Sequence, residues 1–216
     1  MTLLPFQTPV DRAAAIPKVA AHVAAGGLLA YPTETVYGLG SRATTGDVAA
    51  LTALKGRRDR KPFLLLIASR RMAEERGLLF TPAADALAAA FWPGPVTLIL
   101  PGGRGLPDSL RGPEGGIAVR WTSHRGMAEL IAQLGEPLTS TSANRPGGPT
   151  APGVGAIADV FGSAIAAGQL LVLDGGVLGN VPPSTVVDCT TTQSRLVREG
   201  AIPRSELQTR VGRFAP

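Results

Sequence analysis

Apolar positions along this chain form short uninterrupted runs and longer segments with helical spacing. The runs Leu28-Leu29-Ala30 and Phe63–Ala68 have the length of strands, and the second run predicts a strand buried on both faces. With these two included, the predicted strands are 28–31, 63–68, 96–100, 117–121, 137–140, 170–173, 185–189 and 196–198. Between them, segments rich in glycine, proline or hydroxyl residues predict loops at 101–115 and 141–152.

Capping residues and glycines mark the ends of the predicted helices. A cap followed by proline at Thr8-Pro9 opens the first helix, and Gly26-Gly27 ends it. Gly56 ends another helix. Helices are therefore expected at about 8–26, 47–55, 81–91 and 124–134.

The order of these elements predicts the fold class. Strands alternate with helices, which indicates an α/β fold. The last strands follow one another too closely for helical crossovers, so some pairs are expected to be antiparallel and the sheet mixed. No linker divides the chain, and residues 1–216 are expected to form a single domain.

Composition narrows the class of protein. The chain has 216 residues, 44% of them hydrophobic and 17% charged, which is typical of a globular fold. No apolar run approaches the roughly 20 residues of a membrane span, and the first residues do not resemble a signal peptide. The single cysteine, Cys189, excludes an intrachain disulfide and lies in an apolar run, so a buried small side chain is expected. We therefore expect a cytoplasmic protein without a membrane partner.

Charge points to an anionic partner. The net charge is +5 and the sequence pI is about 10.1. The segment Lys55–Lys61 places five cations against one anion in seven residues, whereas a solvated helix face usually interleaves acids. This uneven placement favours a nucleotide or a nucleic acid as the partner.

The segment Tyr31–Gly40 carries the densest candidate chemistry. It contains both tyrosines of the chain and the polar triplet Thr33-Glu34-Thr35, directly after an apolar run. A core strand would not carry that triplet, and a solvent loop rarely carries two tyrosines. The segment is therefore interpreted as a strand end that opens into a site.

Several common signatures are absent from the sequence. There is no Walker A motif, because Lys55 precedes its glycine, and there is no nucleophile elbow or His-Glu-x-x-His motif. Residues 153–158 match the dinucleotide fingerprint formally, but the prolines just before them leave no strand to open it. His22 and His124 are far apart, so a protein-built zinc site is not expected.

Six polar groups instead lie beside predicted strands. Their hydroxyls, amides and arginines are the groups that a polyphosphate site needs when no P-loop is present. One such group alone would indicate a turn, a helix cap or a surface residue. Six groups whose side chains all suit an anionic ligand favour a binding site. The groups are Thr33–Thr35, the cations Lys55, Arg57 and Lys61, then Arg120, Thr139–Asn144, Ser184-Thr185 and Arg198.

At these residues the chain resembles the YrdC-like family, the threonylcarbamoyl-AMP synthases of tRNA modification. Each matching stretch is weak alone, but they occur in order over residues 28 to 202. The stretches are Tyr31–Gly40, Lys55-Gly56-Arg57, Lys61–Leu64, Trp92–Thr97, Ala118–Arg120, Ser142–Asn144, Pro183–Asp188 and Val197–Gly200.

The resemblance implies an activity and a fold. The activity is the synthesis of threonylcarbamoyl-AMP and pyrophosphate from ATP, L-threonine and bicarbonate or CO2, with Mg2+ carried by the ATP phosphates. Other proteins then transfer the threonylcarbamoyl group to tRNA, so tRNA or tRNA-modification proteins are the expected partners. The implied fold is an open, twisted, mixed α/β sheet with a basic concave cleft, in the short single-domain form of the family.

The resemblance also implies roles for individual residues. Lys55 and Arg57 are the implied catalytic cations. The implied ATP contacts are Arg57, Lys61, Ser142, Asn144, Thr150 and Arg198, and the implied threonine contacts are Thr33, Arg120, Ser140 and Ser184.

Two positions depart from the family pattern, and they leave alternatives open. Leu66 stands where a histidine that touches threonine is expected, and Gly116 stands in place of a threonine. A paralogue with the same fold and another substrate therefore stays open. So does a non-catalytic module for double-stranded or structured RNA, although only 5% of the residues are aromatic and could stack on bases.

Overall fold

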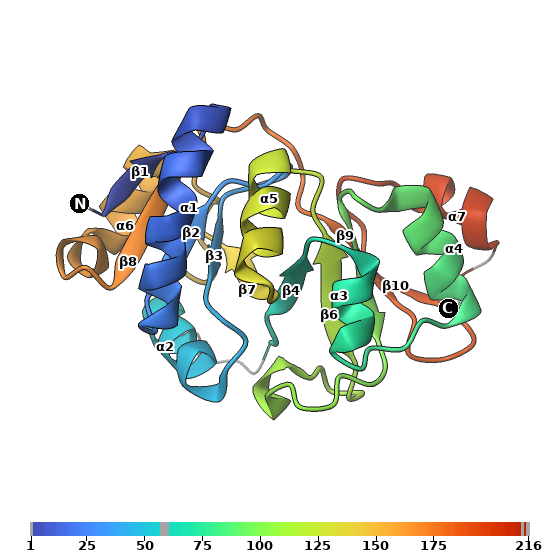
Figure 1. The fold of residues 1–216 in the computed structure, drawn as a ribbon. Coiled ribbons are helices and arrows are strands. Elements are labelled where there is room, and N and C mark those ends of the chain that lie inside the picture. Colours follow the sequence, from blue (N-terminus) through green and yellow to red (C-terminus); the bar gives the residue numbers. More distant parts are fainter. Residues whose placement is uncertain (1, 57–60, 213, 215–216) are drawn as a thin grey trace.

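The computed structural model describes residues 2–56, 61–212 and 214, which form one open mixed sheet with helices on both faces (Figure 1). Most predicted strands and helices are confirmed within a few residues. In chain order the elements are β1 Leu3–Pro5, α1 Pro9–Ala24, β2 Leu28–Tyr31, β3 Gly38–Gly40, α2 Thr45–Lys55, β4 Leu64–Ile67, α3 Arg70–Glu75, α4 Pro82–Phe91, β5 Val96–Leu100, the 3-10 helix η1 Asp108–Leu110, β6 Ile117–Trp121, α5 Arg125–Leu134, β7 Leu138–Ser142, α6 Val154–Ala166, β8 Leu170–Asp174, β9 Thr185–Asp188, β10 Arg195–Arg198 and α7 Arg204–Val211.

The sheet has ten strands in the order β1-β8-β2-β3-β7-β4-β6-β5-β9-β10. β8 is parallel to both β1 and β2, whereas β7 is antiparallel to β3 and to β4. The prediction of a mixed sheet is therefore confirmed. Because strands far apart in the sequence are neighbours here, the polar groups at their ends can meet.

Two apolar clusters hold the helices against the sheet. One cluster packs α1 and α5 against β1, β2, β4, β7 and β8. The other contains buried residues of α2, α4, α6 and α7. In Figure 1, α1 and α5 lie in front of the sheet. No helix in the described part of the chain is long and apolar enough to cross a membrane.

Strand β4 contributes to both clusters. Leu65 and Ile67 belong to the cluster with α2 and α4, whereas Leu66 belongs to the cluster with α1 and α5. The prediction that this strand is buried on both faces is thus confirmed. Leu66 pairs with Arg120 of β6 in a parallel ladder, so the two side chains lie on the same face of the sheet.

Several elements were not predicted. β1 and β3 have only three residues each, which is too short to show a period of two. α3, α6 and α7 also lie where no helix was expected; α6 and α7 have no side-chain cap, and α6 starts after Gly153. The strand expected at 137–140 is instead Leu138–Ser142, so Thr141 and Ser142 belong to the strand rather than to the loop after it.

The glycines of the Tyr31–Gly40 segment allow Tyr31 to pack against the sheet. A Cβ atom on Gly40 would lie 2.1 Å from the backbone oxygen of Thr139 and 2.8 Å from the Tyr31 hydroxyl. That hydroxyl donates a hydrogen bond of 2.9 Å to the same Thr139 oxygen. The glycine therefore permits a close approach of strands β3 and β7.

Gly40→Ala is expected to lower the free energy of unfolding by about 3 kcal/mol, because the added methyl group forces β3 away from β7. Urea denaturation measures the change. Gly46→Ala is the matched control, since Gly46 lies in α2 with no atom within 4 Å of the added methyl. The control should be neutral or slightly stabilising. Equal stability of the Gly40 variant and the wild type would contradict this account of the packing.

Candidate functional site

The loop between β2 and β3 is organised by the hydroxyl of Thr33. Thr33 Oγ1 donates to the backbone oxygen of Val36 at 2.7 Å and accepts from the amides of Thr35 and Val36, both at 3.2 Å. Thr33 is buried, and its hydroxyl also lies 3.1 Å from Thr35 Oγ1. Thr33 thus shapes the loop, and Thr35 extends the polar network toward β6. The contact of Thr33 with a threonine substrate stays a prediction.

Both tyrosines of the segment anchor it to other parts of the fold. Tyr31 reaches β7, as described above. The hydroxyl of Tyr37 donates to the backbone oxygen of Gly176 at 2.8 Å and accepts from the amide of Gly175 at 2.9 Å. Burial raises the pKa of both phenols, so they stay protonated at neutral pH. Tyr37 therefore ties this loop to the segment that follows β8.

Arg120 lies at the centre of the polar residues on this face of the sheet. It comes from β6, only 4% of the residue is exposed, and its Nη1 donates to Thr35 Oγ1 at 3.3 Å. Its Nε lies 3.8 Å from Oε1 of Glu34, and neither of these two buried atoms has a hydrogen-bond partner among the described residues. A buried guanidinium with unused donors suits a carboxylate or phosphate ligand.

Ser184 and Arg198 lie close to this centre. Ser184 Oγ is 2.8 Å from Thr97 Oγ1, and Arg198 Nη2 donates to the backbone oxygen of Ser184 at 2.7 Å. Burial lowers the pKa of Arg198, and the nearby positive charge of Arg120 lowers it further. The two guanidiniums are therefore close enough for their like charges to repel one another. Arg198, implied as an ATP contact, is placed beside an implied threonine contact.

Ser140 joins the same group from β7. It is buried, and a hydrogen bond with Ser140 partly offsets the effect of burial on the pKa of Tyr31. The charge of Arg120 acts on the same phenol. The four implied threonine contacts, Thr33, Arg120, Ser140 and Ser184, are thus linked through shared neighbours.

A second group forms around Lys55 at the end of α2. Gly56, with φ of 67°, ends this helix in a left-handed cap, which leaves Lys55 directed at the end of β7. Lys55 is buried, and its Nζ donates to the backbone oxygen of Ser142 at 2.5 Å and to Asn144 Oδ1 at 2.7 Å. Ser142 Oγ donates to the same Asn144 oxygen at 2.6 Å. Three residues implied at the catalytic and ATP side therefore form one cluster.

Two further implied ATP residues lie at the surface of the described structure. Lys61 and Thr150 are exposed. Arg57 lies outside the described residues, so its implied role stays a prediction.

The two departures from the family pattern occupy different places. Leu66 is completely buried among apolar neighbours on the face that carries Arg120. Gly116 precedes the other end of β6, where a Cβ atom would lie 2.5 Å from Thr190 Cγ2 and 2.6 Å from Ile99 Cγ2. Only Leu66 therefore lies on a strand position next to the site.

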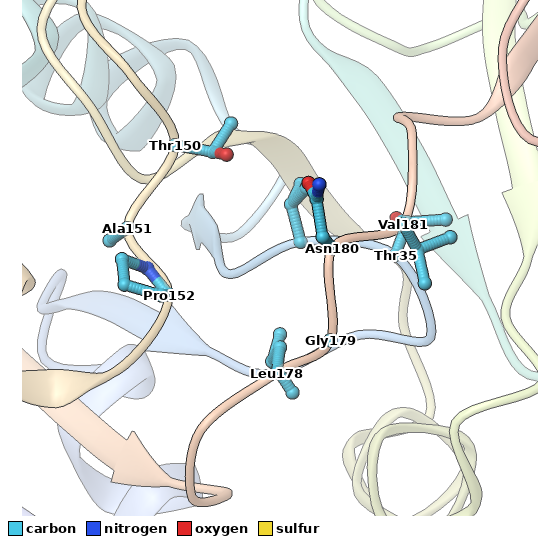
Figure 2. A pocket seen from close by; sticks show the side chains of 9 residues that line it. Thr35, Thr150, Ala151, Pro152, Leu178, Gly179, Asn180 and Val181 are labelled. Atoms are coloured by element: carbon cyan, nitrogen blue, oxygen red, sulfur yellow. The ribbon is translucent and has the colours of Figure 1, made fainter.

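A cavity of about 280 Å³ opens beside the first group. Figure 2 shows Thr150 and Ala151 on one side of it and Thr35, Asn180 and Val181 on the other. Its remaining lining residues are Val36, Pro152, Leu178 and Gly179. Because Thr35 both lines the cavity and contacts Arg120, a ligand in the cavity reaches the edge of the arginine site.

Cys189 is buried, and burial raises the pKa of its thiol to about 12, so the thiol stays protonated at neutral pH. Among the described residues, no three His, Cys, Asp or Glu side chains are close enough to hold a metal ion. The donors that do converge are hydroxyls, amides and cations, which suit anionic ligands.

The profile of the Sua5/YciO/YrdC family, described as telomere recombination, matches residues 21–200. The chain belongs to the Sua5/YciO/YrdC family. This confirms the resemblance seen in the ordered motifs, which span the same part of the sequence. The α/β fold with an open mixed sheet is that of the family.

Members of the Sua5/YciO/YrdC family with curated names are similar over most of this chain. The threonylcarbamoyl-AMP synthase of Thiobacillus denitrificans is 38% identical over 189 residues, which cover 86% of this chain and 97% of that protein. The threonylcarbamoyl-AMP synthase of Pyrococcus abyssi is 34% identical over 194 residues, 89% of this chain. This chain spans only 56% of the length of the Pyrococcus protein.

A solved structure of the Sua5/YciO/YrdC family matches the fold closely. The crystal structure of P. abyssi Sua5 complexed with L-threonine superposes with a TM-score of 0.90 and 31% identity, over 99% of this chain and 62% of that one.

Within the site, the sequence pattern singles out Thr33-Glu34-Thr35 as a group but assigns no role to Thr35 or Glu34. Their contacts with Arg120 depend on pairing across the sheet, which no local signal reveals.

Proposed function

We propose that this chain is an L-threonylcarbamoyladenylate synthase, which makes threonylcarbamoyl-AMP and pyrophosphate from L-threonine, bicarbonate or CO2, and ATP. The observation that carries the proposal is the position of two serines on β7. Ser140 lies with the arginine group and Ser142 with the Lys55 group, and residues two apart in a strand face the same side, about 7 Å apart. A carboxylate site and a phosphate site are therefore neighbours on one face. The relatives named threonylcarbamoyl-AMP synthase support this assignment.

The residues suggest how the two substrates are held. Arg120 would bind the carboxylate of threonine through its Nη atoms, with Arg198 and Ser184 beside it. Lys55 holds Ser142 and Asn144 in place and brings positive charge to the nucleotide side. Lys61 and Arg57 are proposed to contact the phosphates. The cavity between Thr35 and Thr150 offers space beside the arginine group (Figure 2).

The proposed reaction needs no nucleophile from the protein. The threonine amine and bicarbonate form a carbamate with loss of water. A carbamate oxygen then forms a bond to the α-phosphorus of ATP, the bond from that phosphorus to the bridging oxygen breaks, and pyrophosphate leaves. The protein contributes positioning and positive charge at the phosphates, as in other phosphoryl and nucleotidyl transfers.

Magnesium is part of the proposal. The nucleotide side offers an ammonium group, a hydroxyl and an amide, which fit phosphate oxygens better than a bare divalent cation. Mg2+ would therefore be held mainly by the ATP phosphates and water, where it would offset their negative charge. The transfer of the product to tRNA by other proteins, and a location in the cytoplasm, follow from this role and are proposed with it.

The purified protein with ATP, Mg2+ and bicarbonate is expected to release pyrophosphate only when L-threonine is added. Mass spectrometry of the products should show threonylcarbamoyl-AMP. Release with another amino acid would instead indicate a paralogue with a different substrate. No release with any amino acid, together with salt-sensitive binding of structured RNA, would overturn the proposal in favour of a binding module.

A further inference from the structure

Glu34 is the charged residue of the Tyr31–Gly40 segment, and the proposed reaction does not use it. Its side chain is 15% exposed, and its Oε2 accepts a hydrogen bond of 2.6 Å from Thr122 Oγ1. Thr122 is completely buried, and its hydroxyl accepts from the amide of His124 at 3.1 Å. Glu34 is thus fastened to the turn between β6 and α5, two residues beyond Arg120.

The other carboxylate oxygen of Glu34 faces Arg120. Oε1 lies 3.8 Å from Nε of Arg120, and both atoms are buried without a hydrogen-bond partner among the described residues. A buried polar atom left without a partner destabilises the fold, so two that face each other need a compensating interaction. The attraction of their opposite charges, strengthened by burial, supplies that interaction.

This geometry limits what Glu34 can do. Oε2 is already used by Thr122, and Oε1 is shielded from solvent, so neither oxygen is open to the amine of a substrate. Glu34 is therefore badly placed as a base or as a ligand for the ammonium group. Contact at Nε leaves the opposite edge of the guanidinium, with both Nη atoms, for a bidentate carboxylate.

We propose that Glu34, anchored by Thr122, is a positioning residue that fixes the orientation of Arg120 for recognition of the substrate carboxylate. The inference rests on the proposed function, because that function supplies the carboxylate. Glu34 also offsets one of the two positive charges of Arg120 and Arg198, which lets both guanidiniums stay close together.

The test compares Glu34→Gln and Thr122→Val with the wild type, with L-threonine varied at saturating ATP and then with ATP varied at saturating L-threonine. Glutamine keeps the shape of the side chain and can still accept from Thr122, but its amide then faces Arg120 Nε, donor against donor. We expect KM for L-threonine to rise about tenfold in Glu34→Gln, which corresponds to about 1.4 kcal/mol. We expect kcat and KM for ATP to change less than about twofold, because the chemical step is untouched.

The anchor should behave as part of the same unit. Thr122→Val removes the bond to Glu34 and should raise KM for L-threonine by a smaller factor. The double variant should be no worse than Glu34→Gln alone, because both changes disrupt one interaction. A fall in kcat with an unchanged KM for L-threonine, or additive effects in the double variant, would overturn the proposal.

Two controls separate this result from loss of folding and from failure of the proposed function. Glu136→Gln breaks an ion pair of 2.8 Å with Arg42 and should leave KM for L-threonine unchanged. Thermal unfolding checks that each variant is folded.

Calorimetric titration with a panel of amino acids measures carboxylate binding without turnover. If the wild type binds another amino acid and does not use L-threonine, the proposed function fails. The role of Glu34 is then still decided by comparing the Kd for that other amino acid between Glu34→Gln and the wild type. If the wild type binds none, this proposal fails too.

Discussion

Arg120→Ala is expected to lower kcat/KM for L-threonine by about 10²–10³-fold, measured as threonine-dependent pyrophosphate release at saturating ATP. The guanidinium is buried on β6, and it is the cation nearest to Thr35 and Glu34 in the described structure. Alanine removes both the charge and the fork that a carboxylate needs. Arg120→Lys should recover only part of the loss, because an ammonium group cannot bind a carboxylate with two parallel hydrogen bonds.

The controls for this prediction address folding and general charge. Alanine leaves Glu34 buried without its cation, so thermal unfolding must show that the variant is still folded. Arg125→Ala removes an exposed arginine from α5 that pairs with Glu129 at 3.0 Å, and it should leave kcat/KM unchanged. A folded Arg120→Ala variant with near wild-type kcat/KM would exclude Arg120 from substrate binding.

Lys55→Met is expected to lower kcat/KM for ATP by about 10²-fold or more, since it removes a buried positive charge from the nucleotide side. Methionine has a similar length, so it fills the space that the Lys55 side chain occupies. The carbonyl of Ser142 and the amide oxygen of Asn144 lose their shared donor, and the strand end that carries both residues is no longer held. Unlike the Glu34 variant, this one should change the kinetics with respect to ATP more than those with respect to L-threonine.

Lys18→Met is the matched control for Lys55. Lys18 is exposed on α1, so the same change of residue type should leave the kinetics and the stability as they are. Lys55→Met should also be less stable than wild type, by about 1–3 kcal/mol for a buried acceptor without a donor. An unchanged kcat/KM for ATP in a folded Lys55→Met variant would show that Lys55 has a structural role only.

Local pattern was enough to predict the strands with long apolar runs. β4, β5 and β6 were predicted within one or two residues, because side chains buried on both faces leave an uninterrupted run in the sequence. β1 and β3 were missed, because three residues show no period, and α6 was missed, because it starts without a side-chain cap. Their formation depends on pairing and packing with distant residues.

The candidate site could be predicted as a set of residues but not as a geometry. The motifs identified Lys55, Ser142 and Asn144, yet the contact that joins them spans 87 to 89 residues of sequence. The contact between Thr35 and Arg120 spans 85 residues. Only the order of strands in the sheet brings such pairs together, which is why the position of Arg198 beside Ser184 was not foreseen.

The wide separation of these pairs in the sequence affects how the protein folds. Arg120, Ser140 and Ser184 come from three different segments, and the sheet joins strands from both ends of the chain. Folds dominated by such distant pairings form slowly, because loop closure precedes the contacts that reward it. A sheet that lacks any one of these three segments lacks part of the site, so the complete site requires all three segments to be in place. A bound substrate would therefore stabilise the whole sheet and slow hydrogen exchange of backbone amides far from the ligand.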